Sequence, residues 1–440
     1  MKFLLCTFLM FLQIAYAQET VTVVAVGEAE QDTDVISLIK GDGSKFNASQ
    51  SKMIENFYKI IESDFSFYTQ QFKFEGNVTS SESDLKSRFV ILTKFTKNND
   101  RFQLSLNVKD KVKGLILSEN LDIDFTNIRA FSHDVSNKVY KSITGKESIF
   151  KTRILFVSDK TSTRKTMRKE IYIMDFDGEN IERITHKNSI IISPVISPDN
   201  KKVLYSVIED KWTKTSTGQI NKTQNINLHL YDIETKAERM ISNLNGINSG
   251  GIFNKTGDQI YLTISNQDNA DIYKVDLKTL KKTKITSHFS DDVDPHINAD
   301  ESLMTFLSGR PGKAMIYTLD PTGLEKSVKR ISFVGDFNAA PRFNPDGTEI
   351  VFSSWVDNRF DIYRIGSDGR NLVRLTKNFG SNEEPWYSPD GQFIVFTSQR
   401  VISSKKAVQD IYIMNREGEI IKKITGDFGK VYTPRWSNYM

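Results

Sequence analysis

The histidines of this chain are candidate residues for catalysis or metal binding. None belongs to an H-E-x-x-H sequence, the spacing that places two imidazoles on one helix face for zinc. No G-x-S-x-G sequence occurs either, so the turn that carries a hydrolase serine is missing. We therefore expect no catalytic residue, no metal site and no cofactor. The five histidines are His133, His186, His229, His288 and His296.

A group of carboxylates close to two prolines is the other candidate for chemistry. Carboxylates that converge on one channel can hold a hard cation such as Ca²⁺. This group has no ligand loop of fixed spacing, so a solvated acidic rim is the favoured interpretation and a cation site is the alternative. The residues are Asp291, Asp292, Asp294, Glu383 and Glu384.

A repeated tripeptide indicates which elements must position these side chains. Asp-Ile-Tyr occurs at 271–273, 361–363 and 410–412, and related tripeptides end at 172, 229 and 317. The steps between the six third residues are 57, 44, 44, 46 and 49. A period of about 45 residues is typical of a four-stranded propeller blade. We therefore expect a six-bladed β-propeller over residues 151–440.

Each tripeptide is followed by signals of strands and tight turns. A basic-apolar-hydroxyl triplet such as Arg374-Leu375-Thr376 comes next, and then a proline-led strand that closes in a turn, most clearly at residues 385–391. In the Pro-Asp-Gly turn, proline presets φ, aspartate bonds its own backbone and glycine accepts positive φ. The β-branched and aromatic residues at period two fit half-buried strands. Such blades bury both faces only by stacking radially.

The two ends of the repeat region predict how the ring closes. The last repeat stops where its next strand should start, and a strand at 151–158 precedes the first tripeptide. We expect these two segments to pair, because closure removes exposed sheet edges. Extra residues around 211–224 lengthen the first step, and their polar character predicts a surface loop.

The residues just before each repeat proline are expected to rim one mouth of the axial channel. Acidic, small and aromatic side chains mix there, which suits a protein loop as partner. The alternative is that these residues only terminate strands. The candidate partner-binding residues are Ser249, Gly250, Val293, Asp294, Ala339, Glu383, Glu384 and Tyr432.

The region before the propeller contains two further segments. Residues 1–17 have the charged start, apolar stretch and Ala-Tyr-Ala ending of a signal peptide, and the apolar stretch is shorter than the ~20 residues of a membrane span. Residues 18–147 predict a small α/β domain. Its expected helices are 49–63 and 127–143, and its expected strands are 35–39, 88–94, 102–108 and 114–122.

Charge and cysteine content exclude several classes of function. The formal net charge is +4, from 59 basic and 55 acidic residues. No basic run longer than a pair such as Lys281-Lys282 occurs, so no nucleic-acid partner is expected. The single cysteine, Cys6, lies in the predicted signal peptide, which excludes disulfides and thiolate chemistry in the mature chain. No later segment is long and apolar enough to span a membrane.

The order of these parts resembles the TolB family of the Tol–Pal system. The similarity includes the junction from residues 132–136 to Phe150-Lys151-Thr152-Arg153-Ile154, and the ending Pro434-Arg435-Trp436-Ser437. The second blade departs from the pattern at residues 254–257, and residues 18–60 match only in outline. The fold class is thus expected to be a small α/β domain followed by an all-β six-bladed propeller.

The resemblance implies binding in the periplasm and no enzyme activity. TolB-like proteins dock the peptidoglycan-associated lipoprotein, Pal, at the propeller mouth and offer their mature N-terminus to the inner-membrane protein TolA. They support envelope integrity and outer-membrane constriction at division. The alternative function is a propeller accessory module that binds a cell-wall polymer or peptide.

The N-terminal segment 18–26 is therefore a candidate partner epitope. Its alternating residues favour a strand, and a strand close to a free end is rarely held firmly. Such a strand can be added to the sheet edge of a partner. The alternative is a permanent edge strand of the α/β domain. The residues predicted for the epitope are Gln18, Glu19, Thr20, Val21, Thr22 and Val23.

Overall fold

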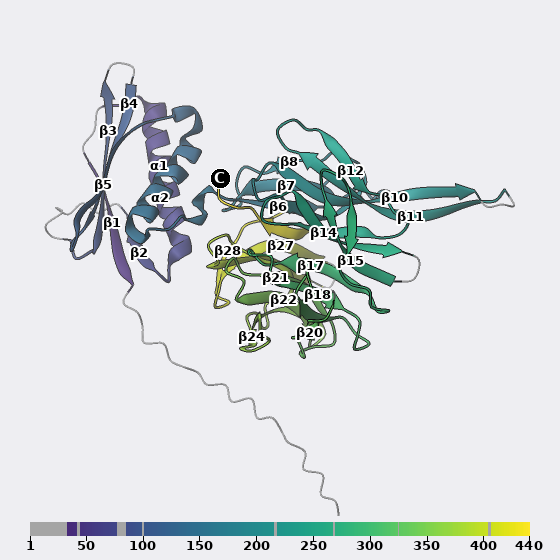
Figure 1. Ribbon diagram of the computed structural model, residues 1–440. Coiled ribbons are helices and arrows are strands. Elements are labelled where there is room, and N and C mark those ends of the chain that lie inside the picture. The colour runs from purple at the N-terminus through teal and green to yellow at the C-terminus, as the bar shows by residue number, and fades with distance from the viewer. Residues whose placement is uncertain are drawn as a thin grey trace, which may run out of the picture.

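The computed structural model describes residues 33–41, 45–76, 85–98, 101–214, 218–266, 269–323, 325–403 and 406–440. Two regions follow one another along the chain, an α/β region and a β-propeller (Figure 1). The predicted signal peptide and the candidate epitope 18–26 lie outside the described residues. No helix of the described ranges is long and apolar enough to cross a membrane.

The α/β region is a five-stranded sheet with two helices on the face turned toward the propeller (Figure 1). The strand order is β2-β1-β3-β4-β5, with β1 parallel to both β2 and β3. The elements are β1 (Asp34–Lys40), α1 (Ala48–Phe65), the 3₁₀ turn η1 (Ser66–Tyr68), β2 (Phe72–Glu75), β3 (Phe89–Asn98), β4 (Arg101–Asp110), β5 (Gly114–Asp122), η3 (Phe125–Asn127), α2 (Ile128–Thr144) and η4 (Ile149–Lys151).

Local signals explain both helices. Asn47 and Gln50 form a reciprocal capping box at the start of α1. Gly145 follows α2 with φ of 74°, as expected of a glycine past a helix end. The sequence did not predict β2, which has four residues and buries only Phe72; so short a strand shows no period.

The propeller has six four-stranded blades, as the repeat predicts. From the innermost strand outward they are β9 (Ile190–Ile196), β10 (Lys202–Lys214), β11 (Ile220–Asp232) and β12 (Glu238–Ser242); β13 (Asn248–Phe253), β14 (Gln259–Asn266), β15 (Asn269–Asp276) and β16 (Lys282–Lys284); β17 (Asp292–Ile297), β18 (Met304–Ser308), β19 (Met315–Leu319) and β20 (Lys329–Arg330); β21 (Asn338–Phe343), β22 (Glu349–Val356), β23 (Arg359–Gly366) and β24 (Val373–Arg374); β25 (Ser381–Tyr387), β26 (Phe393–Ser403), β27 (Lys406–Asn415) and β28 (Ile420–Lys423); and β29 (Val431–Trp436), β6 (Arg153–Ser158), β7 (Glu170–Asp175) and β8 (Glu182–Arg183).

The ring closes by pairing of its two ends, which confirms the predicted closure. Strand β29 pairs antiparallel with β6, from Val431 opposite Ser158 to Trp436 opposite Ile154. The Trp436 Nε1–H also donates to the Thr152 hydroxyl over 2.8 Å. The closing blade thus joins residues almost three hundred positions apart, and both ends of the repeat are paired.

The segment 211–224 is a correction to the sequence-based expectation. Residues 211–214 and 220–224 belong to a long hairpin, in which β10 pairs with β11 from Lys202 opposite Asp232 out to Lys214 opposite Ile220. Residues 215–217 lie outside the described residues. The mainly polar composition suggested a loop, because a hairpin that projects into solvent buries no regular apolar side.

The α/β region packs on the end of the propeller that carries the Pro-Asp-Gly turns. The Tyr68 hydroxyl donates to Asp390 over 2.8 Å, and Arg129 pairs with Asp175 at 3.1 Å and with Asp177. These partners lie in or beside turns of the propeller, at the ends of innermost strands and of β7. The starts of the innermost strands, and hence the other mouth of the channel, face away from the α/β region.

Candidate binding site at the channel mouth

Each innermost strand contains a β-bulge at the mouth. The register against the neighbouring strand shifts there in all six blades. At the bulge one residue adopts the left-handed region, and in five blades that residue is not glycine. Such a conformation costs on the order of 1–3 kcal/mol for a residue with a side chain, and bulges commonly re-aim side chains at functional sites. The residues and their φ values are Ser193 (50°), Gly250 (65°), Asp294 (55°), Ala340 (50°), Glu384 (58°) and Thr433 (46°).

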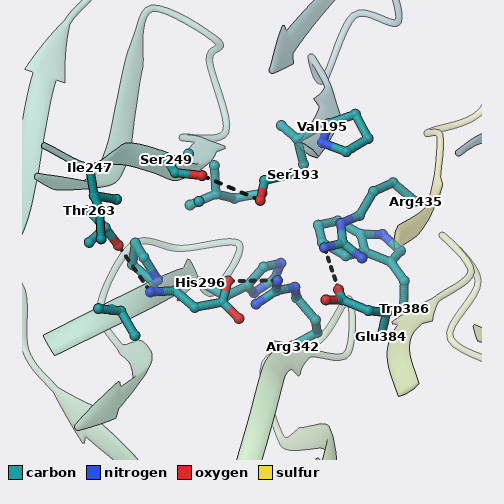
Figure 2. A pocket seen from close by; sticks show the side chains of 17 residues that line it. Ser193, Val195, Ile247, Ser249, Thr263, His296, Arg342, Glu384, Trp386 and Arg435 are labelled. Atoms are coloured by element: carbon teal, nitrogen blue, oxygen red, sulfur yellow. Dashed lines mark hydrogen bonds and ion pairs between the residues drawn. The ribbon is translucent and has the colours of Figure 1, made fainter. Parts of the chain in front are cut away.

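The bulges surround a pocket in the axis of the ring. Its volume is about 290 Å³, and every innermost strand contributes to its wall (Figure 2). One lining residue from each strand, in chain order, is Ser193, Ser249, Asp294, Arg342, Glu384 and Arg435. The pocket is preformed, because the wall is made of strands and not of loops.

Two arginines in the wall repeat the same arrangement in different blades. Arg342 donates through Nη1 to the carbonyl of Pro341 over 2.8 Å and through Nη2 to Asp294 over 2.8 Å. Arg435 donates in the same way to Pro434 over 3.0 Å and to Glu384 over 2.8 Å. Each arginine is about 95% buried and reaches the bulge residue of the preceding blade. These pairs therefore join neighbouring blades at the mouth.

Trp386 lies close to both guanidinium groups. The Cζ atoms of Arg342 and Arg435 are 5.4 and 4.9 Å from its ring centroid. The ring of His296 meets Trp386 edge-on with centroids 5.1 Å apart. A cation close to an aromatic face is attracted by its quadrupole, so the tryptophan stabilises both arginines in the pocket wall (Figure 2).

Burial and charge set the protonation of the mouth residues. Burial, together with the charges of Arg342 and Arg435, lowers the pKa of His296 well below 6.5. Its Nδ1 accepts the backbone N–H of Phe343 over 3.2 Å, which suits a neutral ring. Burial tends to raise the pKa of Glu384, but the two arginines outweigh it and the pKa is lowered. Burial and the neighbouring Glu384 raise the pKa of Glu383.

The structure brings together most of the sequence-predicted mouth residues. Five of them line the pocket, namely Ser249, Gly250, Val293, Asp294 and Glu384. Ala339, Glu383 and Tyr432 lie beside the bulges but outside the pocket lining. The Lys169 ammonium lies 3.6 Å from the centroid of the Tyr432 ring.

The prediction of a solvated acidic rim is wrong in one respect, because most of its carboxylates form ion pairs with arginines. Asp292 is fully buried and pairs with Arg310 at 2.8 Å. Asp294 and Glu384 pair with the wall arginines. Among the described residues, no group of three histidine, cysteine or acidic side chains is arranged to hold a metal ion.

Sequence reasoning missed the residues that follow the prolines. His296, Arg342, Trp386 and Arg435 all occupy this position and all line the pocket. The available signal was the repeat itself, because the residue after each proline must recur at the same height in the ring. The predicted site contained only residues before the prolines and therefore did not include these four.

The fold and the site define a class, the six-bladed β-propeller proteins with a pocket at the axial mouth. The family model described as the TolB β-propeller domain matches residues 140–339 and 322–439. The chain therefore belongs to the TolB β-propeller family.

Individual relatives agree with this assignment. The Tol-Pal system protein TolB of Francisella tularensis subsp. mediasiatica is 26% identical over 365 residues, which cover 80% of each chain. That of F. tularensis subsp. tularensis strain FSC 198 is 26% identical over 365 residues, covering 80% of this chain and 79% of the relative. The crystal structure of TolB from Acinetobacter baumannii shares the fold, with a TM-score of 0.74 at 23% identity, covering 94% of this chain and 98% of that one.

Proposed function

We propose that this chain is a periplasmic scaffold protein of a Tol–Pal-like envelope system and acts by binding, without catalysis. Its propeller mouth takes a loop of a Pal-like, peptidoglycan-associated lipoprotein, and its mature N-terminus takes a TolA-like inner-membrane protein. The cleaved signal peptide 1–17 directs it to the periplasm. In this way it supports envelope integrity and outer-membrane constriction at division.

The observation that carries the proposal is the strained, preformed pocket at the mouth. Six bulges hold its shape, and five of them use non-glycine residues at positive φ. Strain of this kind persists only where the surrounding structure imposes it and is concentrated at functional sites. A pocket of about 290 Å³ has room for one or two side chains of a protein loop, and a preformed wall lowers the cost of ordering on binding.

The loops beside the pocket supply further surface for a protein partner. Phe289 and Phe333 are 85% and 73% exposed, and Phe337 is 43% exposed. They precede the innermost strands β17 and β21 and so lie at the mouth end of the propeller. Aromatic side chains are enriched in protein interfaces. A lipoprotein loop seated in the pocket would cover these rings.

The experiment is to fill the pocket at Gly250. A Cβ there would come no closer than 3.6 Å to other atoms, and the equivalent residue of the other five blades carries a side chain. We expect Gly250→Lys to weaken binding to the purified lipoprotein domain at least tenfold, measured by calorimetry. The matched control is Gly114→Lys in the α/β region, which has φ of 82° and open space around it.

Three outcomes decide between the functions. Loss of lipoprotein binding in Gly250→Lys alone supports the proposal. Unchanged binding by a folded Gly250→Lys variant overturns the pocket as the lipoprotein site. Retention on peptidoglycan without any lipoprotein would favour the wall-polymer function.

A further inference from the structure

Hairpins of three consecutive blades project from the mouth end of the propeller. Ser158, the last residue of β6, pairs with Val431 at the start of β29, so the β6–β7 loop leaves from the mouth. The β10–β11 and β26–β27 hairpins also extend past the starts of their innermost strands. The closing blade contacts both neighbouring blades through β29. We call the described residues of these three hairpins, 159–169, 209–214, 218–223, 399–403 and 406–407, the basic sector.

The β6–β7 loop concentrates positive charge. Residues 159–169 contain five cations and one carboxylate, that of Asp159. Asp159 is engaged, since it accepts the backbone N–H of Lys430 over 2.7 Å. Arg164 and Lys165 are exposed. The five cations are Lys160, Arg164, Lys165, Arg168 and Lys169. They form two adjacent pairs, Arg164-Lys165 and Arg168-Lys169, and the single residue Lys160, so the loop contains no long basic run.

Carboxylates near the other two hairpins are mostly paired. Asp210 pairs with Lys222 at 2.7 Å, and Asp410 with Lys423 at 3.4 Å. Arg400 and Lys406 are exposed beside the tip of the β26–β27 hairpin. The acidic exceptions are exposed Glu209, which accepts from Asn227 over 2.6 Å, and exposed Asp427 in a neighbouring loop. The surplus of charge at the tips is therefore positive.

Each hairpin also exposes apolar side chains. These side chains stand on protruding hairpins, and the β10–β11 hairpin extends well beyond the body of the propeller (Figure 1). The Lys222 ammonium lies 5.4 Å from the centroid of the Trp212 ring. The residues and their exposed fractions are Met167 (63%), Trp212 (64%), Ile220 (65%), Val401 (79%) and Ile402 (60%).

The opposite part of the mouth has a different character. Its exposed rings, Phe289 and Phe333, are followed in their own loops by Asp291 and Asp336. Asp336 pairs with Lys313 at 3.4 Å, so this part lacks the positive surplus of the basic sector. An anionic surface would therefore attract the basic sector more strongly. The two parts of the mouth therefore suit different partners.

We infer that the basic sector docks on the surface of an anionic phospholipid bilayer. Apolar side chains combined with lysine and arginine bind at the interface of anionic membranes, where tryptophan is also favoured. The arginines and lysines would meet the lipid phosphates while the tips enter the headgroup layer. Separate protruding tips fit a soft, continuous surface better than the concave face of one protein. This places the channel mouth toward the bilayer surface.

The test is co-sedimentation of the mature chain with protein-free vesicles. We expect binding to vesicles that contain phosphatidylglycerol and none to pure phosphatidylcholine vesicles. Arg164→Glu with Lys165→Glu should lower the partition coefficient by about thirtyfold, from the usual contribution of each basic residue near an anionic surface. Val401→Ser with Ile402→Ser should also weaken binding.

Two matched controls make the result specific. Lys281→Glu with Lys282→Glu changes the net charge equally, in the β15–β16 turn at the other end of the propeller. Phe289→Ser removes an exposed ring of the opposite part of the mouth. Both should bind vesicles as the unaltered chain does. The tryptophan fluorescence should shift to shorter wavelength on binding, and Trp212→Phe should remove that shift.

Other outcomes overturn the inference. Absence of binding to phosphatidylglycerol vesicles, or equal loss in both charge-reversal variants, would contradict it. Binding only to vesicles that carry an inserted membrane protein would replace the lipid by a protein partner. Because these vesicles contain no lipoprotein, the result is independent of the proposed lipoprotein site.

Discussion

The guanidinium of Arg435 lies 2.8 Å from the carboxylate of Glu384, and the two residues belong to neighbouring blades. Arg342 and Asp294 repeat this contact two blades earlier, also at 2.8 Å. The carboxylates at the mouth are thus structural partners of buried cations as well as residues of the pocket wall. Their replacement by lysine would place a cation against a buried arginine, so charge reversal cannot be a mild test of binding.

We predict that Glu384→Ala destabilises the propeller by about 2 kcal/mol. Breaking a fully buried pair costs more, but the Glu384 side chain is 32% exposed and water can screen part of the loss. Urea unfolding measures the change. Glu384→Gln, which keeps an acceptor for Arg435, should lose less. Equal stability of the alanine variant and the unaltered chain would contradict the role of the pair.

His296 predicts a dependence of stability on pH. Its pKa in the folded chain is lowered well below 6.5 by burial and by the two arginines. As the pH falls, His296 therefore takes up a proton at a higher pH in the unfolded chain than in the folded chain. The stability present above pH 6.5 is lost as the pH falls toward the pKa of the folded chain. The loss between pH 6.5 and 5.5 is about 1 kcal/mol. His296→Gln should remove it in unfolding measurements at both pH values, whereas the exposed control His186→Gln should keep it.

Deletion of residues 434–440 should destabilise the whole propeller. The deletion removes half of β29, which includes the Trp436 pairing with β6, and opens the ring. Thermal melting by circular dichroism should show a lower midpoint. Deletion of Tyr439 and Met440 alone leaves β29 intact and serves as the control. An unchanged midpoint in the longer deletion would mean that the closing pair contributes little.

Deletion of residues 18–26 from the mature chain tests the candidate epitope. If the segment is a transferable strand, the remainder stays folded and binds the lipoprotein but loses the TolA-like partner. Pull-down with each partner, with melting of the same variant as the control, measures both effects. A lower melting midpoint of the α/β region would instead indicate a permanent edge strand.

The sequence by itself determined the six-bladed ring, its closure and the two helices. Each depends on local signals, namely the Pro-Asp-Gly turns, strands of period two, the capping residues of α1 and the glycine after α2. The turn and strand signals recur with each repeat, so a weak copy such as residues 254–257 did not alter the count. Such signals act over a few neighbouring residues, where composition and conformation are directly linked.

Only the tertiary structure decided which residues and contacts form the channel mouth. A bulge depends on register against the next strand, and the pairing of Asp294 with Arg342 joins residues 48 positions apart. The sequence shows the charge of Glu384 but not the buried guanidinium that neutralises it. It shows five cations in residues 159–169, but not that β6 and β7 present them at the mouth. Contacts between blades depend on how the blades stack, and no local pattern encodes that stacking.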